Sequence, residues 1–291
     1  MSDNQPLSGT WGLAEGDPIA PGLAAVADLG GGNLYEVWLA FDERLHTLVV
    51  AKMLRPSHLG VESSRQAMAR EVEMLQRLQH PSIVRMFGHD LEGPAIPYFT
   101  LEYIDGPTLS SLIRTHGALP VHQLLPLALE LASALHFMST EDVVHLDLKP
   151  SNVVMGAPAK LLDLSIAMEA TTAAGIDYPL GSDEYMAPEQ CDPGPHGQMG
   201  LASDVWGLGA TLYRAATGER AFHREPRWSQ LYDEPMPMPA TVAPPVAALI
   251  LDCLAPDPAD RPAPAEIVAR IEPMMEALPT AWLSGFSLMR R

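Results

Sequence analysis

The sequence contains little cysteine, which excludes several classes of protein. Its 291 residues include two cysteines, Cys191 and Cys253. Two thiols are too few for the disulfide framework of a small secreted domain or for a cysteine-based metal cluster. Redox chemistry is therefore not expected, and a reducing, cytoplasmic location is the simplest interpretation.

Long apolar runs and a secretion signal are also missing. The first residues, MSDNQPLSGTWGLAEGDP, have neither the basic start nor the apolar core of a signal peptide. A membrane-spanning helix needs roughly 20 apolar residues. The longest candidate runs, LLPLALELASALHFM and VAALILDCLA, are interrupted by Glu130 or too short. They predict buried helices in a soluble protein without a membrane span.

Positive charge is scarce as well. Lysine and arginine total 18 against 36 aspartates and glutamates, which gives a formal net charge of -18. This balance argues against nucleic-acid binding through a basic face and favours basic partners, although a solubilising acidic surface is the simpler explanation. The three lysines, Lys52, Lys149 and Lys160, mark candidate positions for a compact ammonium in place of a planar guanidinium.

The chain does contain enough apolar residues, 47%, for one large domain or for two lobes around a cleft. Residues 1–19 are rich in Gly, Pro and Ser and predict a flexible lead-in. Residues 20–104 contain strand-like alternation, as in LYEVWLAF and TLVVAKML, and one helical stretch, residues 63–79. They predict a small antiparallel sheet that carries one helix.

Most of the remaining chain has helical periodicity. The chain after Asp105 includes PVHQLLPLALELASALHFM, DVWGLGATLYRAATG, PPVAALILDCLAPDP and APAEIVARIEPMMEAL. The change from strands to helices after Asp105 marks a boundary between two lobes and predicts an α+β fold. Residues 276–291 are interpreted as a C-terminal tail, whose apolar residues are candidates for docking on the domain or on another protein.

Two patterns with chemical potential lie in the first lobe. Gly30, Gly31 and Gly32 separate two strand-like runs in LGGGNLYEVW, and such glycines let a backbone approach phosphate oxygens, although they also form ordinary hairpin turns. Lys52 ends the strand VVAKML, and Glu71 on the following helix is a candidate partner that would hold the ammonium against phosphates. The alternative is a strand-end lysine that points to solvent.

The third pattern is VVHLDLKPSNVVM followed by DLS. Asp147 can orient a hydroxyl, Lys149 can neutralise a phosphate, and Asn152 and Asp163 can supply oxygen ligands for Mg²⁺. These are the parts that phosphoryl transfer requires. A polar turn between two strands is the alternative interpretation.

In their order along the chain, the glycine-rich loop, Lys52, Glu71, HLDLKPSN, DLS and APE resemble the motifs of the bacterial Hanks-type (eukaryotic-like) serine/threonine protein kinases. The resemblance extends over residues 20–275. It implies a two-lobed fold, with a small antiparallel sheet plus one helix in an N-lobe (residues 20–104) and a mainly helical C-lobe (residues 105–275). It also implies transfer of the ATP γ-phosphate to protein hydroxyls, with Mg²⁺ as cofactor.

The resemblance assigns roles to individual residues. Asp147 would orient the substrate hydroxyl, Lys149 would contact the γ-phosphate, and Lys52 would bind the α- and β-phosphates. Asn152 and Asp163 would hold magnesium. The residues implied in nucleotide binding, the last four of them in the hinge LEYIDG, are Gly30, Gly31, Gly32, Val37, Lys52, Glu71, Leu101, Glu102, Tyr103 and Ile104. Structural roles are implied for Glu189 with Arg261, and for Asp204 beneath the catalytic loop; solvated helix-end charges are the alternative.

The chain departs from the kinase pattern at four places. Tyr35 stands where the third glycine of the loop is expected, and Leu164 and Ser165 replace the Phe and Gly of the usual DFG. Ser182 stands where many of these kinases have threonine, and it keeps a hydroxyl for Asp147 and Lys149. These changes predict a loop with less freedom and an altered DFG segment that retains its metal ligand.

The fourth departure is Leu146, beside Asp147. An arginine at this position grips a phosphate on the activation segment, which leucine cannot do. Thr171 and Thr172, candidate phosphorylation sites between DLS and APE, are therefore not expected to control activity through this position.

Two further interpretations remain. A pseudokinase that binds nucleotide and acts as a scaffold or signalling adaptor would carry the same fold, and a binding protein unrelated to kinases is the third hypothesis. For an active enzyme, the expected partners are proteins with a serine or threonine to phosphorylate, basic ones among them, and a regulatory protein or a second copy of the chain.

Overall fold

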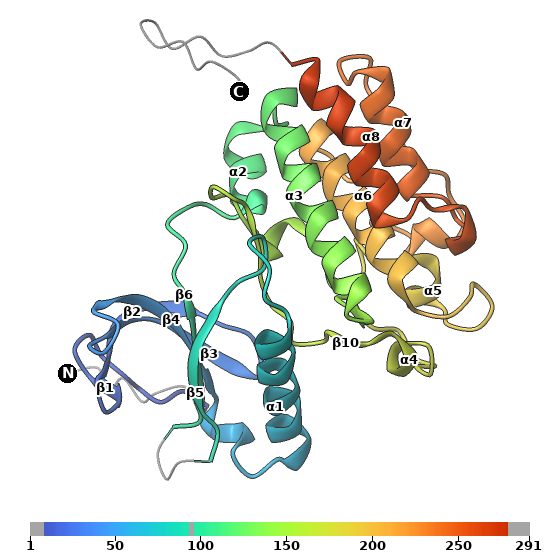
Figure 1. The fold of residues 1–291 in the computed structure, drawn as a ribbon. Helices are drawn as coiled ribbons and strands as arrows, with labels where there is room; N and C mark the ends of the chain where they lie inside the picture. The colour runs from blue at the N-terminus through green and yellow to red at the C-terminus, as the bar shows by residue number, and fades with distance from the viewer. Residues whose placement is uncertain (1–8, 93–95, 279–291) are drawn as a thin grey trace, which may run out of the picture.

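The structure is a computed structural model that describes residues 9–92 and 96–278, and it has two lobes (Figure 1). In the described part of the N-lobe, a six-stranded antiparallel sheet has the order β1-β2-β3-β4-β6-β5, and helix α1 lies beside it. The C-lobe is mainly helical. The two-lobed α+β fold predicted from the sequence is therefore confirmed.

The strands of the sheet are β1 (Pro18–Ala20), β2 (Leu23–Gly30), β3 (Tyr35–Asp42), β4 (Thr47–Leu54), β5 (Met86–Asp90) and β6 (Tyr98–Glu102). Helix α1 spans Glu62–Arg77 and buries one apolar face, as its periodicity predicts. Successive side chains of a strand point to opposite faces. In β4, Val49, Ala51 and Met53 fill one face of the sheet, so that Lys52 projects from the other.

The segment before the sheet packs against it. Ile19 is buried in the apolar cluster on the face with Val49, and Trp11 covers part of the same cluster. Trp11 Nε1 also donates a hydrogen bond of 2.9 Å to Leu54 O. The expectation of a flexible lead-in is therefore wrong for residues 9–19, because two large apolar side chains in this stretch have a face of the sheet to cover.

The elements after the sheet belong mainly to the C-lobe. Its helices are α2 (Leu109–His116), α3 (Val121–Thr140), α4 (Ala170–Ala173), α5 (Pro188–Cys191), α6 (Leu201–Thr217), α7 (Pro244–Cys253) and α8 (Pro264–Glu276). The short strands are β7 (Val143–Val144), β8 (Val153–Val154), β9 (Lys160–Leu161) and β10 (Met168–Glu169). Single 3-10 turns are η1 (Pro56–His58), η2 (Pro150–Asn152), η3 (Ser229–Leu231) and η4 (Pro258–Asp260).

The four helices expected from periodicity correspond to α3, α6, α7 and α8. The sequence does not predict helix α2 because LSSLIRTH is short and half polar. The N-cap residue of α2 is Thr108, whose hydroxyl accepts a hydrogen bond from Ser111 N at 3.1 Å. Helix α6 is buried along nearly its whole length, between α3 and α7. None of the helices in the described ranges has the length and apolarity that crossing a membrane requires.

A buried ion pair joins α5 to the turn η4. Arg261 donates to both carboxylate oxygens of Glu189, at 2.7 and 2.9 Å, and both side chains are 0% exposed. The Ser203 hydroxyl, at the start of α6, donates a further bond of 2.7 Å to Glu189. Glu189 and Arg261 are thus paired inside the lobe, not solvated.

We expect Arg261→Ala to lower the free energy of unfolding by about 3–5 kcal/mol, because it leaves the Glu189 carboxylate buried without its charge partner. Urea unfolding followed by circular dichroism measures the loss. Arg270→Ala is the matched control: its bond to Asp252, at 2.7 Å, lies on the surface, so the loss should stay below about 1 kcal/mol. Equal losses in the two variants would contradict the prediction.

Candidate active site

The ammonium of Lys52 is held by two carboxylates. Lys52 Nζ lies 2.6 Å from Glu71 Oε1 on α1 and 3.1 Å from Asp163 Oδ1 in the segment after β9. Burial alone would lower the pKa of Lys52, but the Glu71 and Asp163 carboxylates outweigh it and hold this pKa above its ordinary value. Lys52 therefore stays charged, bonded to residues from both lobes.

Asp163 has an unusual backbone conformation, and its pKa is set by the neighbouring Lys52. Its φ is +62°, in the left-handed region that aspartate tolerates better than most residues. Burial would raise the pKa of Asp163, but Lys52 more than offsets this effect and keeps the pKa below its ordinary value. The next residue, Leu164, is fully buried. The left-handed residue of DLS is Asp163 and not Ser165, so a serine fits without strain.

Tyr35 does not belong to the glycine-rich loop. It begins β3, and its buried ring makes an edge-to-face contact with Phe99, at a centroid distance of 5.8 Å. Lys52 Nζ lies 4.6 Å from the centre of the same ring. Burial, followed by the nearby Glu71 carboxylate, raises the pKa of Tyr35. The ring thus covers the Lys52–Glu71 pair, and the expectation that Tyr35 stiffens the loop misses its main role.

The loop itself, between β2 and β3, keeps its glycines for a steric reason. Gly31 has φ +133°, and a Cβ atom there would lie 2.3 Å from Tyr35 O, so a side chain is excluded. The neighbouring residues tie the loop down: Gly30 N donates to Asp28 Oδ1 at 2.7 Å, and Gly32 O accepts from Arg55 Nε at 2.9 Å. The backbone of this turn is therefore exposed to solvent, but its conformation is fixed by these contacts.

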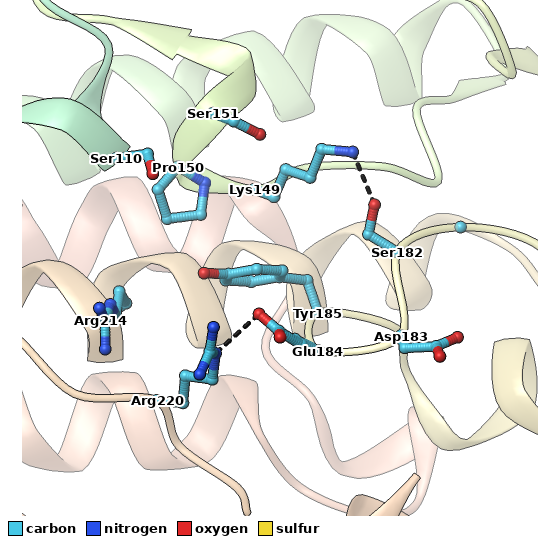
Figure 2. A pocket seen from close by; sticks show the side chains of 11 residues that line it. Ser110, Lys149, Pro150, Ser151, Ser182, Asp183, Glu184, Tyr185, Arg214 and Arg220 are labelled. Carbon is cyan, nitrogen blue, oxygen red and sulfur yellow. Dashed lines mark hydrogen bonds and ion pairs between the residues drawn. The ribbon is translucent and has the colours of Figure 1, made fainter. Parts of the chain in front are cut away.

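A second polar cluster lies between β7 and β8. Lys149 Nζ donates to Asp147 Oδ2 at 2.6 Å. It also donates to Ser182 Oγ at 2.6 Å (Figure 2). Asn152 Nδ2 donates to Asp147 O at 2.9 Å and to Asp147 Oδ2 at 3.2 Å. The remaining carboxylate oxygen, Asp147 Oδ1, is buried and has no hydrogen-bond partner within the described residues. Asp147 is thus held by one oxygen and free to accept a proton or hydrogen bond at the other.

The backbone of this cluster rests on α6. Asp204, buried at the start of α6, accepts hydrogen bonds of 2.7 Å from His145 N and Leu146 N. Burial raises the pKa of Asp204, and the electrostatic effect of His145 and the two amide donors oppose the rise. Asp204 therefore fixes the direction in which the Asp147 segment leaves β7.

In the hinge, residues 101–104, the groups that a nucleotide base could reach are backbone groups and not side chains. Leu101 is buried in β6, and the amide N–H of Glu102 is already donated to Arg85 O at 2.8 Å. The Glu102 carboxylate is bound by Lys160 Nζ at 2.6 Å. No described residue accepts a hydrogen bond from the amide N–H of Ile104. A nucleotide base can therefore use the N–H of Ile104, whereas the N–H of Glu102 is taken.

Two side-chain oxygens, those of Asn152 and Asp163, could serve as ligands for a divalent cation. Because Asn152 commits its amide nitrogen to Asp147, its side-chain oxygen is left for a metal. Asp163 Oδ1 is bonded to Lys52 and its side chain is partly exposed. One amide and one carboxylate oxygen fit Mg²⁺, which takes few protein ligands and completes its shell with water and phosphate.

Comparison with known proteins agrees with this geometry. Residues 23–271 match the family described as the protein kinase domain. The chain belongs to the protein kinase family. It is 31% identical over 249 residues to serine/threonine-protein kinase PknB of Mycobacterium leprae, covering 80% of this chain and 39% of that protein. It is 30% identical over 267 residues to a probable serine/threonine-protein kinase of Corynebacterium efficiens, covering 84% and 40%. These relatives place it among the bacterial Hanks-type kinases, and the chain spans about 40% of their length.

An apolar cluster surrounds Leu146, beside Asp147, in the kinase domain of this chain. Leu146, 3% exposed, is buried with Val144, Ala173 and Met199. Leu146 has φ +63°, a conformation that a leucine adopts only when its surroundings impose it. Ala173 belongs to α4, so the cluster packs the activation segment against the catalytic loop. Thr171 and Thr172 lie on the exposed side of the same short helix.

Some residues of the site carry little signal in the sequence. Gln190 is buried, and its side-chain amide nitrogen, Nε2, donates to Leu146 O at 2.8 Å and to Leu180 O at 2.9 Å. Its position directly after APE is the only feature that would have suggested this role. The stacking of Tyr35 on Lys52 was also not foreseen, although strand alternation places Tyr35 and Val37 on the same face of β3.

We expect the ring of Tyr35, and not its hydroxyl, to stabilise the site. Tyr35 Oη has no hydrogen-bond partner among the described residues, so Tyr35→Phe should change the free energy of unfolding by less than about 1 kcal/mol. Tyr35→Ala empties the space above Lys52 and should cost roughly 3–5 kcal/mol. Urea unfolding of both variants measures the difference. A phenylalanine variant as unstable as the alanine variant would show that the hydroxyl bonds Glu71 in solution.

Proposed function

We propose that this chain is an ATP-dependent protein serine/threonine kinase. The observation that carries the proposal is the state of Asp147, a buried carboxylate with one oxygen held by Lys149 and Asn152 and the other without a partner among the described residues. Such a group is positioned to orient a hydroxyl and accept its proton. The names of the bacterial relatives support the same activity.

ATP binding is proposed at the junction of the lobes. The adenine would border Leu101 and Val37 and use the N–H of Ile104, together with the backbone of Glu102 and Tyr103. The loop Gly30–Gly32 would cover the phosphates, and Lys52, held by Glu71, would bind them. The formed Lys52–Glu71 pair supports this assignment, because a charge already fixed at the site needs no further reorganisation when a phosphate binds.

The residues around Asp147 would carry out the transfer. Asp147 Oδ1 would orient the serine or threonine hydroxyl and take its proton, while Lys149 would neutralise charge on the transferred phosphoryl group. Ser182, bonded to Lys149, would keep that ammonium in position. Asn152 and Asp163 would hold Mg²⁺, which supplies charge neutralisation for the phosphate oxygens when bound.

We expect Asp147→Asn to lower kcat by about 10²–10⁴-fold, because an amide cannot accept the hydroxyl proton. Transfer from labelled ATP and magnesium to a generic serine/threonine protein measures kcat, and nucleotide affinity should be unchanged. Asp142→Asn is the control, since it makes the same change at an exposed position nearby. If the parent and Asp147→Asn both bind ATP and neither transfers phosphate, the protein is a nucleotide-binding scaffold.

We also propose that the activation segment is held by apolar packing at Leu146 and not by a phosphate. The double variant Thr171→Ala, Thr172→Ala should therefore keep kcat within about threefold of the parent, because the side chain beside Asp147 has no charge with which to bind a phosphate. Treatment of the parent with a phosphatase should likewise leave its activity in place. Loss of activity on either treatment would show control by phosphorylation of the segment.

A further inference from the structure

A pocket of about 520 Å³ opens beside the proposed catalytic lysine. Lys149 and Ser182 line one side of it, and Arg214 and Arg220 line the other, with the ring of Tyr185 between them (Figure 2). The hydroxyl end of Tyr185 points toward the side on which Arg214 lies. The pocket therefore joins the Asp147–Lys149 cluster to two guanidinium groups.

The guanidinium of Arg214 is poorly neutralised. Arg214 projects from α6 and is 25% exposed, and its ion pair within the described residues is with Glu219 at 3.7 Å. The Glu219 side chain is 78% exposed, and a loose pair of this kind near water contributes little. Most of the five N–H donors of Arg214 are therefore available to a ligand in the pocket.

The acidic residues that line the pocket are already bound. Asp183 accepts from Arg227 at 2.8 and 3.1 Å and from Trp228 Nε1 at 3.0 Å. Glu184 lies 2.7 Å from Arg220 and 2.8 Å from Arg224. Each of these carboxylates has at least one guanidinium partner, so neither is left to neutralise Arg214.

The charge of the pocket is thus opposite to that of the whole chain, whose net charge is -18. A basic ligand would meet Arg214 at short range, where the repulsion of like charges outweighs a diffuse attraction that salt screens. A carboxylate would instead receive two parallel N–H donors from the planar guanidinium.

We propose that this pocket binds an acidic side chain, aspartate or glutamate, of the protein substrate, close in sequence to the serine or threonine that is phosphorylated. Arg214 is the specificity-determining residue, and Arg220, bridged to Glu184, completes the basic wall. The proposal rests on the proposed kinase function and adds the class of sequence that it acts on. It differs from the expectation of basic partners that net charge favours.

The test compares the full chain with Arg214→Glu on matched peptides that differ only in having aspartate, alanine or lysine at each position around one serine. The parent should show a kcat/KM at least about tenfold higher for aspartate than for lysine at one of these positions, the size expected for a charge-assisted pair. Arg214→Glu should reverse the order, and Arg214→Lys should keep a weaker form of it.

Arg44→Glu is the control for net charge, because Arg44 is exposed in the turn between β3 and β4 of the other lobe. It should leave the peptide preference unchanged. Circular dichroism confirms that each variant is folded. The proposal is overturned if the parent phosphorylates aspartate and lysine peptides equally well, or if Arg214→Glu keeps the parent's preference.

A failure of the kinase function itself is recognised separately. In that case the parent transfers phosphate to no peptide, and direct binding of the same peptides, measured by fluorescence anisotropy, decides the question. Tighter binding of the aspartate peptide that is lost in Arg214→Glu supports the pocket. Equal binding of the aspartate and lysine peptides overturns it.

Discussion

The catalytic segment depends on one buried carboxylate, that of Asp204. Its two oxygens take the N–H groups of His145 and Leu146, each at 2.7 Å, and so hold the chain as it leaves β7. The same side of α6 carries Gly207 and Thr211. A Cβ at Gly207 would come within 3.2 Å of Leu148 O, and the Thr211 hydroxyl donates to that oxygen at 3.4 Å. Spacings of three and seven residues lie on one face of a helix, so a single stripe of α6 positions the segment that contains Asp147.

The apolar cluster around Leu146 affects how the segment between Asp163 and Glu189 is ordered. Where an arginine binds a phosphate, the energy that orders the activation segment exists only after phosphorylation. Burial of Leu146 with Ala173 and Met199 supplies ordering energy that is always present. Gln190 adds two hydrogen bonds that join Leu146 O to Leu180 O in the activation segment. Under the proposed kinase function, regulation would then act at another place, such as substrate access or the Lys52–Glu71 pair.

The sequence predicts the fold and the motif residues because both leave periodic or ordered signals, such as the alternation of β4 and the sequence HLDLKPSN. It does not predict which atoms those residues contact in the folded protein. Tyr35 is seen in the sequence only as a missing glycine, whereas the structure uses its ring to cover Lys52. Similarly, the hinge residue Glu102 has a side chain bonded to Lys160 and an N–H bonded to Arg85 O. These contacts depend on how separate strands are packed, which one sequence does not reveal.

The lysines and arginines of the chain bind carboxylates in different ways. Each of the three lysines of the sequence lies 2.6 Å from one carboxylate, that of Glu71, Asp147 or Glu102, as suits a compact point charge. Two arginines each give two hydrogen bonds to one carboxylate: Arg261 to Glu189 and Arg227 to Asp183. Arg214 follows Thr211 by three residues and so lies on the same stripe of α6 as Asp204. Among the described residues, its guanidinium has no carboxylate within close hydrogen-bond distance. Because the pair that Arg214 makes with Glu219 is long, at 3.7 Å, a closer carboxylate partner is expected to come from the proposed substrate.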